Sequence, residues 1–281
     1  MVELINNENL FLILLAIVWI IGAIIQDMRR REVDNIWNFS LIGIALAYRL
    51  AISIGVSNYW YFFNGVIGLV VFLLVGNAFY YSRLFAGGDA KLLIALGTIL
   101  PLSYNWIINF KIFGLFIMMF LIGGSIYVFS WSFILVFFNF NNFKKEFGKE
   151  FKRIKSLFGF GIFFAALWIL ASYFLGIEFV VVGLIFILFP ALFAYTRAVE
   201  HSCMIKRVSS KDLTVGDWLH EDIFVGGKKI RKDWQGVSKE ELLLIRKKYK
   251  RKILVRYGVP FTPSFLIGLA GLLWINKIGF I

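Results

Sequence analysis

Residues 10–27 read LFLILLAIVWIIGAIIQD, an almost uninterrupted apolar run that ends in Gln26 and Asp27. A helix needs about 20 mainly apolar residues to cross the hydrocarbon core of a bilayer. Similar runs recur along the 281-residue chain, of which 60% is hydrophobic, against about 45–50% in soluble globular proteins. The sequence therefore predicts a polytopic α-helical membrane protein and excludes a disordered chain.

We expect about eight transmembrane helices, at residues 10–27, 36–54, 60–82, 90–108, 112–138, 157–175, 178–196 and 260–280. The fourth is the weakest, because Pro101 interrupts it. Residues 1–9 contain no basic residue, so the first run does not read as a cleaved signal peptide and is kept as structure.

Basic residues predict the orientation of these helices. The net charge of +13 would favour nucleic-acid binding in a soluble protein. Here the Lys and Arg residues flank apolar segments. The orientation of the helices in the membrane and contact with anionic lipid headgroups therefore explain these residues, and no nucleic-acid partner is predicted. With the N-terminus outside, only Arg49, Lys111 and Lys277 of the 30 Lys and Arg face outward. We therefore expect both termini outside.

The long polar region at 200–258 divides the chain into a transmembrane part at 1–199, a small cytoplasmic α+β domain and a last helix within 259–281. We expect strands over 203–208, 218–225, 228–231 and 253–255, with a hairpin-type turn at Gly226-Gly227. Ser238 and Glu241 have capping-box spacing and predict a helix to about residue 252. The domain carries fifteen basic and eight acidic residues, so anionic lipid would attract it.

Two aspartates stand at predicted membrane boundaries. Asp27 ends the first span, and Asp89 follows Gly87-Gly88 before the fourth. Carboxylates near hydrocarbon are costly and suggest function, and the predicted topology puts both on the cytoplasmic side. Structural interpretations stay open: Asp27 could neutralise Arg29–Arg31, and Asp89 could be the N-cap of the fourth span.

Two carboxylates held close together cannot both ionise, so one keeps a proton while the other stays basic. Such a pair can deprotonate a water for attack on a peptide carbonyl and protonate the departing amine. Gly87 and Gly88 would let the backbone approach a neighbour closely. Lys91 and Arg29 could tune the pair or bind substrate.

Other polar and glycine positions read as structural. Asp34 is expected to cap the second span, Asp217 to lie in a turn, and Gly65, Gly68, Gly123 and Gly124 to serve helix packing. His201 and His220 with the single Cys203 are too few ligands for zinc, and one cysteine permits no intramolecular disulfide. No HExxH or Walker loop occurs, so no metal or cofactor is predicted.

Residues 20–100 resemble the type IV prepilin peptidase family of GxGD membrane aspartic proteases, especially its archaeal preflagellin and prepilin peptidase branch. In that family an aspartate ends the first span and is followed by arginines and an Ile-Pro-Asn; residues 27–38 here read DMRRREVDNIWN. The second motif, GxGD with a following x-Lys, matches residues 86–91, AGGDAK. This chain has Ala86 where the motif has its first glycine. Residues 206–263 also resemble the C-terminal domain of the archaeal branch.

The resemblance implies an aspartic endopeptidase that removes a short basic class III signal peptide from pilin-like or archaellin precursors at the cytoplasmic membrane face. Asp27 and Asp89 would be its catalytic pair, without an assigned base or acid. The supporting motif residues would be Ala86, Gly87, Gly88, Lys91 and Arg29. Bacterial members often add a paired-cysteine zinc module and N-methyltransferase activity, which one cysteine cannot support.

Other functions remain open. A presenilin-type intramembrane protease would need a Tyr-Asp pair, but Gln26 precedes Asp27. A small transporter should place ionisable residues near mid-span, where this chain has almost none. A non-enzymatic scaffold of a pilus or secretion machine would need neither aspartate.

Overall fold

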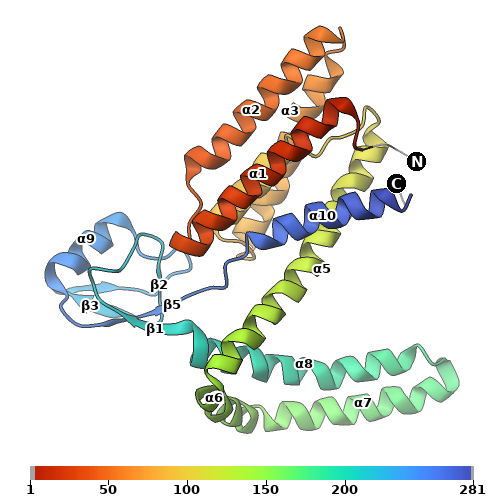
Figure 1. Ribbon diagram of the computed structural model, residues 1–281. Helices are drawn as coiled ribbons and strands as arrows, with labels where there is room; N and C mark the ends of the chain where they lie inside the picture. The colour runs from red at the N-terminus through yellow and green to blue at the C-terminus, as the bar shows by residue number, and fades with distance from the viewer. Residues whose placement is uncertain (1–3, 280–281) are drawn as a thin grey trace. The chain divides into compact units, whose positions relative to one another are not determined.

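The computed structural model describes residues 4–279, which form two compact units. The first unit contains the residues up to Ser130 and those from Val259 onward, and the second is Trp131–Gly258. Figure 1 shows the helices and strands of both units. The functional division into 1–199, 200–258 and 259–281 stays a prediction.

Five helices and the first part of a sixth build the first unit: α1 (Asn7–Arg30), α2 (Asn35–Gly55), α3 (Trp60–Tyr81), α4 (Gly87–Leu96), α10 (Pro263–Lys277) and the start of α5 (Trp106–Phe138). Asp34 is the N-cap residue of α2, as expected, but its side chain makes no capping hydrogen bond. Its carboxylate instead pairs with Arg30 at 2.7 Å.

Within residues 4–279, six helices rather than the expected eight are long and apolar enough to cross a membrane: α1, α2, α3, α5, α7 (Lys155–Leu175) and the continuous segment Phe179–Met204. The predicted fourth and eighth spans are too short, because α4 has 10 residues and α10 has 15. At 1.5 Å per residue these helices are about 15 and 22 Å long, under the roughly 30 Å of hydrocarbon. Proline disfavours helix at the residue before it, and the chain ahead of Pro101 leaves the helix.

The segment after α4 continues in non-helical form to the opposite end of the unit. At the start of α4, Gly88 lies against Val33, just beyond the C-terminus of α1. Near the end of the segment after α4, the Leu102 carbonyl accepts a 2.8 Å hydrogen bond from Asn9, in the first turn of α1. Residues 87–105 therefore pass along the whole of α1 although only ten of them are helical.

Arg49 holds this non-helical passage. Its side chain is fully buried, although the sequence predicts Arg49 among the few basic residues that face outward. The guanidinium donates to the carbonyls of Thr98, Ile99 and Pro101 and of Tyr61, over 2.8–3.0 Å. Backbone carbonyls without helix partners need donors in an apolar interior, and Arg49 supplies them.

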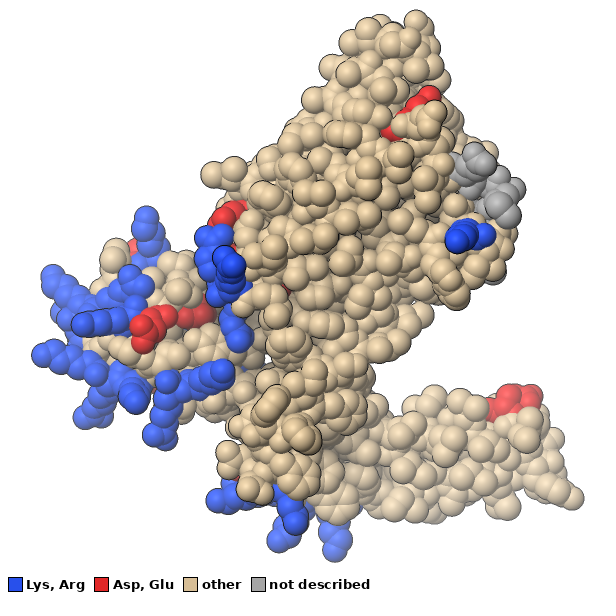
Figure 2. Space-filling model, in the orientation of Figure 1, with Lys and Arg blue, Asp and Glu red and all other residues tan. Residues whose placement is uncertain are grey.

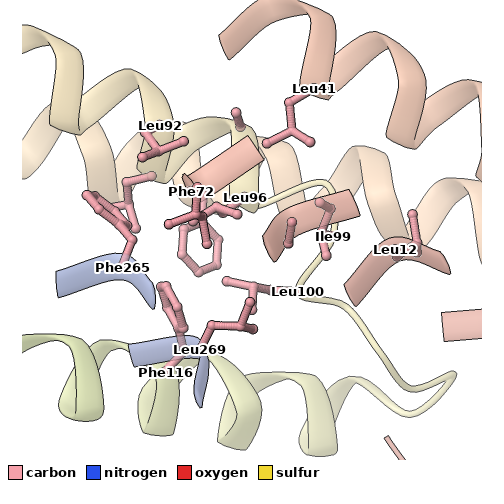
Figure 3. Packing of buried hydrophobic residues seen from close by; sticks show 14 of the residues in the cluster. Leu12, Leu41, Phe72, Leu92, Leu96, Ile99, Leu100, Phe116, Phe265 and Leu269 are labelled. Carbon is pink, nitrogen blue, oxygen red and sulfur yellow. The ribbon is translucent and has the colours of Figure 1, made fainter. Parts of the chain in front are cut away.

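The core of the first unit is apolar and closely packed (Figure 3). Phe72 of α3 packs edge-on against Phe113 of α5, at a centroid distance of 5.1 Å. Gly68 of α3 contacts the Gly97 carbonyl so closely that a Cβ there would overlap it. Gly65 similarly lies against the Arg49 side chain. These contacts confirm helix packing as the role of both glycines.

Helices and a small sheet region build the second unit. After the end of α5, α6 (Phe140–Arg153), α7 and α8 (Phe179–Val199) follow, with a π-helix at Glu200–Met204. Gly161 of α7 approaches the Phe186 carbonyl, and Gly183 of α8 approaches the Ala165 carbonyl. Small residues permit such close helix contacts within membranes.

The polar region is a small α+β fold, as predicted. Its elements are β1 (Ile205–Val208), β2 (Trp218–Leu219), β3 (Ile223–Val225), β4 (Lys228–Ile230), α9 (Lys239–Lys248) and β5 (Ile253–Arg256). One sheet has the order β1-β5-β2, with antiparallel pairs, and β3-β4 form a hairpin. Basic side chains cover this region in Figure 2.

Several boundaries in this region differ from the prediction. β1 begins at Ile205 because Cys203 belongs to the π-helix, and the predicted strand 218–225 is broken between β2 and β3. The capping box of Ser238 and Glu241 is present, but α9 ends at Lys248. Gly226 and Gly227 have φ of 57° and 84°, as a two-residue hairpin turn with both central φ positive requires.

Candidate functional site

Asp27 lies in the last turn of α1 and is only 8% exposed. Its Oδ2 accepts two hydrogen bonds from Thr262, from the hydroxyl at 2.9 Å and from the backbone N–H at 3.3 Å. Thr262 is itself fully buried. The Asp27 carboxylate is therefore directed into the protein, toward the start of α10.

Asp89 lies in the first turn of α4, ahead of that helix's apolar residues. Ala86, not Asp89, is the N-cap residue, which corrects the capping interpretation. Asp89 occupies the third helical position, and its carboxylate accepts a hydrogen bond from the Ala86 backbone N–H. Ala86 has φ −70° and ψ 160°, a conformation open to any residue, so the missing first glycine of the motif causes no strain.

The two carboxylates interact. Burial, together with the negative charge of Asp27, raises the pKa of Asp89, while the hydrogen bond from Ala86 opposes that shift. A shift of this kind is expected when two acidic groups share a desolvated site. The fold therefore brings together the two aspartates that the sequence singled out, which are separated by two helices.

Contacts around the second motif connect α4 with its neighbours. The Lys91 Nζ donates to Asn35 Oδ1 at 2.6 Å, so it links α4 to the start of α2. A Cβ on Gly88 would lie 3.5 Å from the Val33 backbone nitrogen, an ordinary contact distance. Arg29 is exposed at the end of α1. Lys91 thus has a structural contact, whereas Arg29 stays available at the surface.

Sequence reasoning missed two residues close to Asp27. One is Thr262, whose Phe261-Thr262-Pro263 context shows a helix start but gives no link to residue 27. The other is Tyr127 of α5, which interacts electrostatically with Asp27. Both are remote from Asp27 in sequence, so only tertiary structure could reveal them.

The remaining polar candidates lie in the second unit. The Thr214 backbone N–H donates to Asp217 Oδ2 at 2.7 Å, which confirms the turn. Cys203 is buried, and the rings of His201 and His220 are 6.0 Å apart. Among residues 4–279, no three His, Cys, Asp or Glu side chains are grouped as a metal site would need.

Residues 13–138, which include both aspartates and Arg49, match the Type IV leader peptidase family. Over this region the chain is similar to that family. Thr262 lies beyond the matched residues.

Two archaeal preflagellin peptidases are similar to part of this chain. A preflagellin peptidase of Methanococcus maripaludis (strain C6 / ATCC BAA-1332) is 30% identical over 148 residues, covering 47% of this chain and 64% of that protein. A preflagellin peptidase of Methanococcus voltae is 28% identical over 119 residues, covering 42% of this chain and 46% of that protein. The chain thus spans less than two thirds of either relative. No solved structure matches it.

Proposed function

We propose that this protein is a membrane aspartic endopeptidase that removes a short basic leader from pilin-like or archaellin precursors. One observation carries the proposal: Asp27 and Asp89, both within the leader peptidase match, lie at the same end of the helical unit, and the charge of Asp27 acts on Asp89. The names of the relatives support preflagellin-like substrates.

The arrangement supports acid–base catalysis on a peptide bond. A carboxylate can take a proton from water as the water attacks the scissile carbonyl, and a protonated carboxyl can supply the leaving amine. Burial and the charge of Asp27 raise the pKa of Asp89, which favours Asp89 as the protonated member of the pair.

In this proposal, the end of the first unit that holds Asp27 and Asp89 faces the cytoplasm. Arg29, Arg30 and Arg31 follow Asp27, and cytoplasmic loops are enriched in such residues. Because the chain that follows Asp89, residues 90–105, runs the length of the unit, it serves as one crossing in the alternation of helices, which keeps Asp27 and Asp89 on one side. A precursor could then leave its apolar helix in the lipid and present its basic leader to the aspartates.

Anionic lipids are the proposed surroundings of α6. Exposed basic side chains on this helix include Lys144, Lys145, Lys152 and Arg153, while Phe143 packs against Tyr195 of α8. Each base near an anionic surface contributes about 1 kcal/mol of attraction. Lys144→Gln with Lys145→Gln should therefore reduce the stability gained in anionic over neutral nanodiscs, and an unchanged gain would argue against lipid contact there.

The proposal is tested by incubating the full chain in liposomes with a precursor that carries a basic leader and an apolar helix. We expect one cleavage between these two parts, mapped by mass spectrometry. If wild-type protein cleaves no such precursor but supports pilus assembly in cells, a non-enzymatic scaffold is the better explanation.

A further inference from the structure

Thr262 directs its hydroxyl group away from its own helix. It is the N-cap residue of α10, yet its side chain caps no backbone N–H there. N-cap threonines normally accept a hydrogen bond from the second or third helical N–H. Here Oγ1 and the backbone nitrogen both donate to a single oxygen, Oδ2 of Asp27. Two donors from one residue thus converge on one carboxylate oxygen.

Packing fixes these donors in place. The Phe261 ring lies 5.4 Å from that of Phe120 and 5.8 Å from that of Phe85, between centroids. A Cβ on Gly124 of α5 would lie 2.9 Å from the Phe261 ring and 3.0 Å from Ser264 Oγ. The start of α10 is therefore wedged between aromatic rings and a glycine, so Thr262 is preorganised toward Asp27.

The two aspartates consequently have unequal surroundings. Asp27 accepts two hydrogen bonds at the N-terminus of α10, whose dipole favours negative charge. Asp89 accepts one backbone hydrogen bond, from Ala86. The other titratable groups that act on Asp27 include Asp89 itself and Tyr127 of α5. Hydrogen bonds to a charged group stabilise it, so the two donors of Thr262 make the surroundings of Asp27 suitable for a carboxylate.

We propose that Thr262 is a positioning residue that holds Asp27 as the carboxylate base of the pair and leaves Asp89 as the protonated acid. This inference rests on the proposed function. Asp27 takes a proton from water while the water oxygen bonds to the scissile carbon and the carbonyl π electrons move to oxygen. Asp89 then protonates the leaving nitrogen as the C–N bond breaks and the carbonyl re-forms. Proton exchange with solvent returns the proton from Asp27 to Asp89.

Cleavage kinetics test the positioning role of Thr262, with the buried hydroxyl of Ser264 as the matched control. Thr262→Val removes the donor to Asp27, and Ser264→Ala removes a fully buried hydroxyl that has no hydrogen-bond partner among the described residues. Loss of a hydrogen bond to a charged group should lower kcat roughly 10–100-fold, with KM little changed. The acid limb of the pH profile should move to higher pH. Thr262→Ser should restore both values, and Ser264→Ala should leave them unchanged.

Carbodiimide labelling tests the same point without any precursor, because the reagent modifies protonated carboxyl groups. On the purified full chain at neutral pH, peptide mass spectrometry should find Asp89 modified and Asp27 protected. Thr262→Val should expose Asp27 to modification, and Thr262→Ala replaces it if the valine variant does not fold. Thr262→Ser should keep Asp27 protected. Equal labelling of both aspartates in the wild type, or no effect of the Thr262 variants, would overturn the inference. Wild-type protein with this labelling pattern but no cleavage would instead refute the proposed function alone.

Discussion

The Arg49 Nη2 lies 2.8 Å from the carbonyl oxygen of Pro101, 52 residues further along the chain. This contact fastens α2 to the segment in which the polypeptide leaves the helix inside an apolar unit. The same guanidinium also reaches the Thr98 and Ile99 carbonyls. The buried guanidinium thus stabilises the non-helical segment after α4 by hydrogen bonds to backbone carbonyls, without a carboxylate partner among these contacts.

Arg49→Met should destabilise the first unit strongly. The substitution leaves several buried carbonyls without donors, and each such loss costs about 1–3 kcal/mol, so we expect a total of at least about 3 kcal/mol. Thermal unfolding of the purified protein in detergent measures the effect. Lys111→Met, which removes an exposed cation of α5, should leave the melting temperature nearly unchanged. Equal melting of both variants would show that the Arg49 hydrogen bonds contribute little.

Gly68→Ala should also destabilise the fold, because the new methyl group would overlap the Gly97 carbonyl and Pro101. Overpacking of this kind costs roughly 1–3 kcal/mol. Gly43→Ala on α2 is the control, since no atom lies within 4 Å of the added Cβ. That variant should be neutral or gain up to about 1 kcal/mol from helix propensity. Thermal unfolding of both variants decides the point, and a stable Gly68→Ala protein would contradict the packing seen here.

Asp27→Asn and Asp89→Asn should each lower precursor cleavage roughly 100-fold or more, because an amide can neither take nor give the required proton. The double variant should lose little further activity, since the two residues act as a unit. Cleavage by membranes that contain equal amounts of inserted protein is the measurement.

Two other aspartates provide controls for that experiment. Asp34 makes an exposed ion pair with Arg30, and Asp217 accepts a hydrogen bond in a turn. Asp34→Asn and Asp217→Asn should each cost no more than about 1 kcal/mol of stability and should retain cleavage. Substantial cleavage by either Asp27→Asn or Asp89→Asn would remove the support for a catalytic pair.

The raised pKa of Asp89 predicts a loss of activity toward alkaline pH. Burial and the charge of Asp27 favour the protonated form of this acid in the folded protein. The proton needed by the leaving amine is therefore present at low pH and is lost as pH rises through the folded-state pKa. The free energy of unfolding should also fall as pH rises from the ordinary aspartate pKa, about 3.9, to the raised pKa of Asp89 in the folded protein. Melting curves against pH should show this fall in the wild type and not in Asp89→Asn.

Orientation can be measured by labelling introduced cysteines with an impermeant reagent. Cys203 is buried and unsuitable, so it is first replaced by alanine. Ile177→Cys, in the exposed turn between α7 and α8, should be labelled in intact cells. Lys228→Cys, on β4, should be labelled only after the membrane is opened. The reverse pattern would invert the proposed topology and place both aspartates outside.

Several features followed from the sequence because they depend on local chemistry. Apolar runs specify membrane helices wherever they are long enough, since unpaired backbone groups are costly in lipid. The capping box of Ser238 and Glu241, the hairpin glycines at 226–227 and the turn at Asp217 likewise need only neighbours within a few residues. Asp27 and Asp89 stood out through their motifs and their positions beside the membrane.

Tertiary structure decided what depends on distant partners. Residues 90–108 are apolar enough to suggest a full span, but α4 ends at Leu96 and the chain continues in non-helical form because Arg49 satisfies its carbonyls. Thr262 has no local feature that connects it with Asp27, 235 residues earlier. Local sequence specifies which groups require a hydrogen-bond partner, whereas the packing of α1, α4, α5 and α10 determines which partner each of them finds.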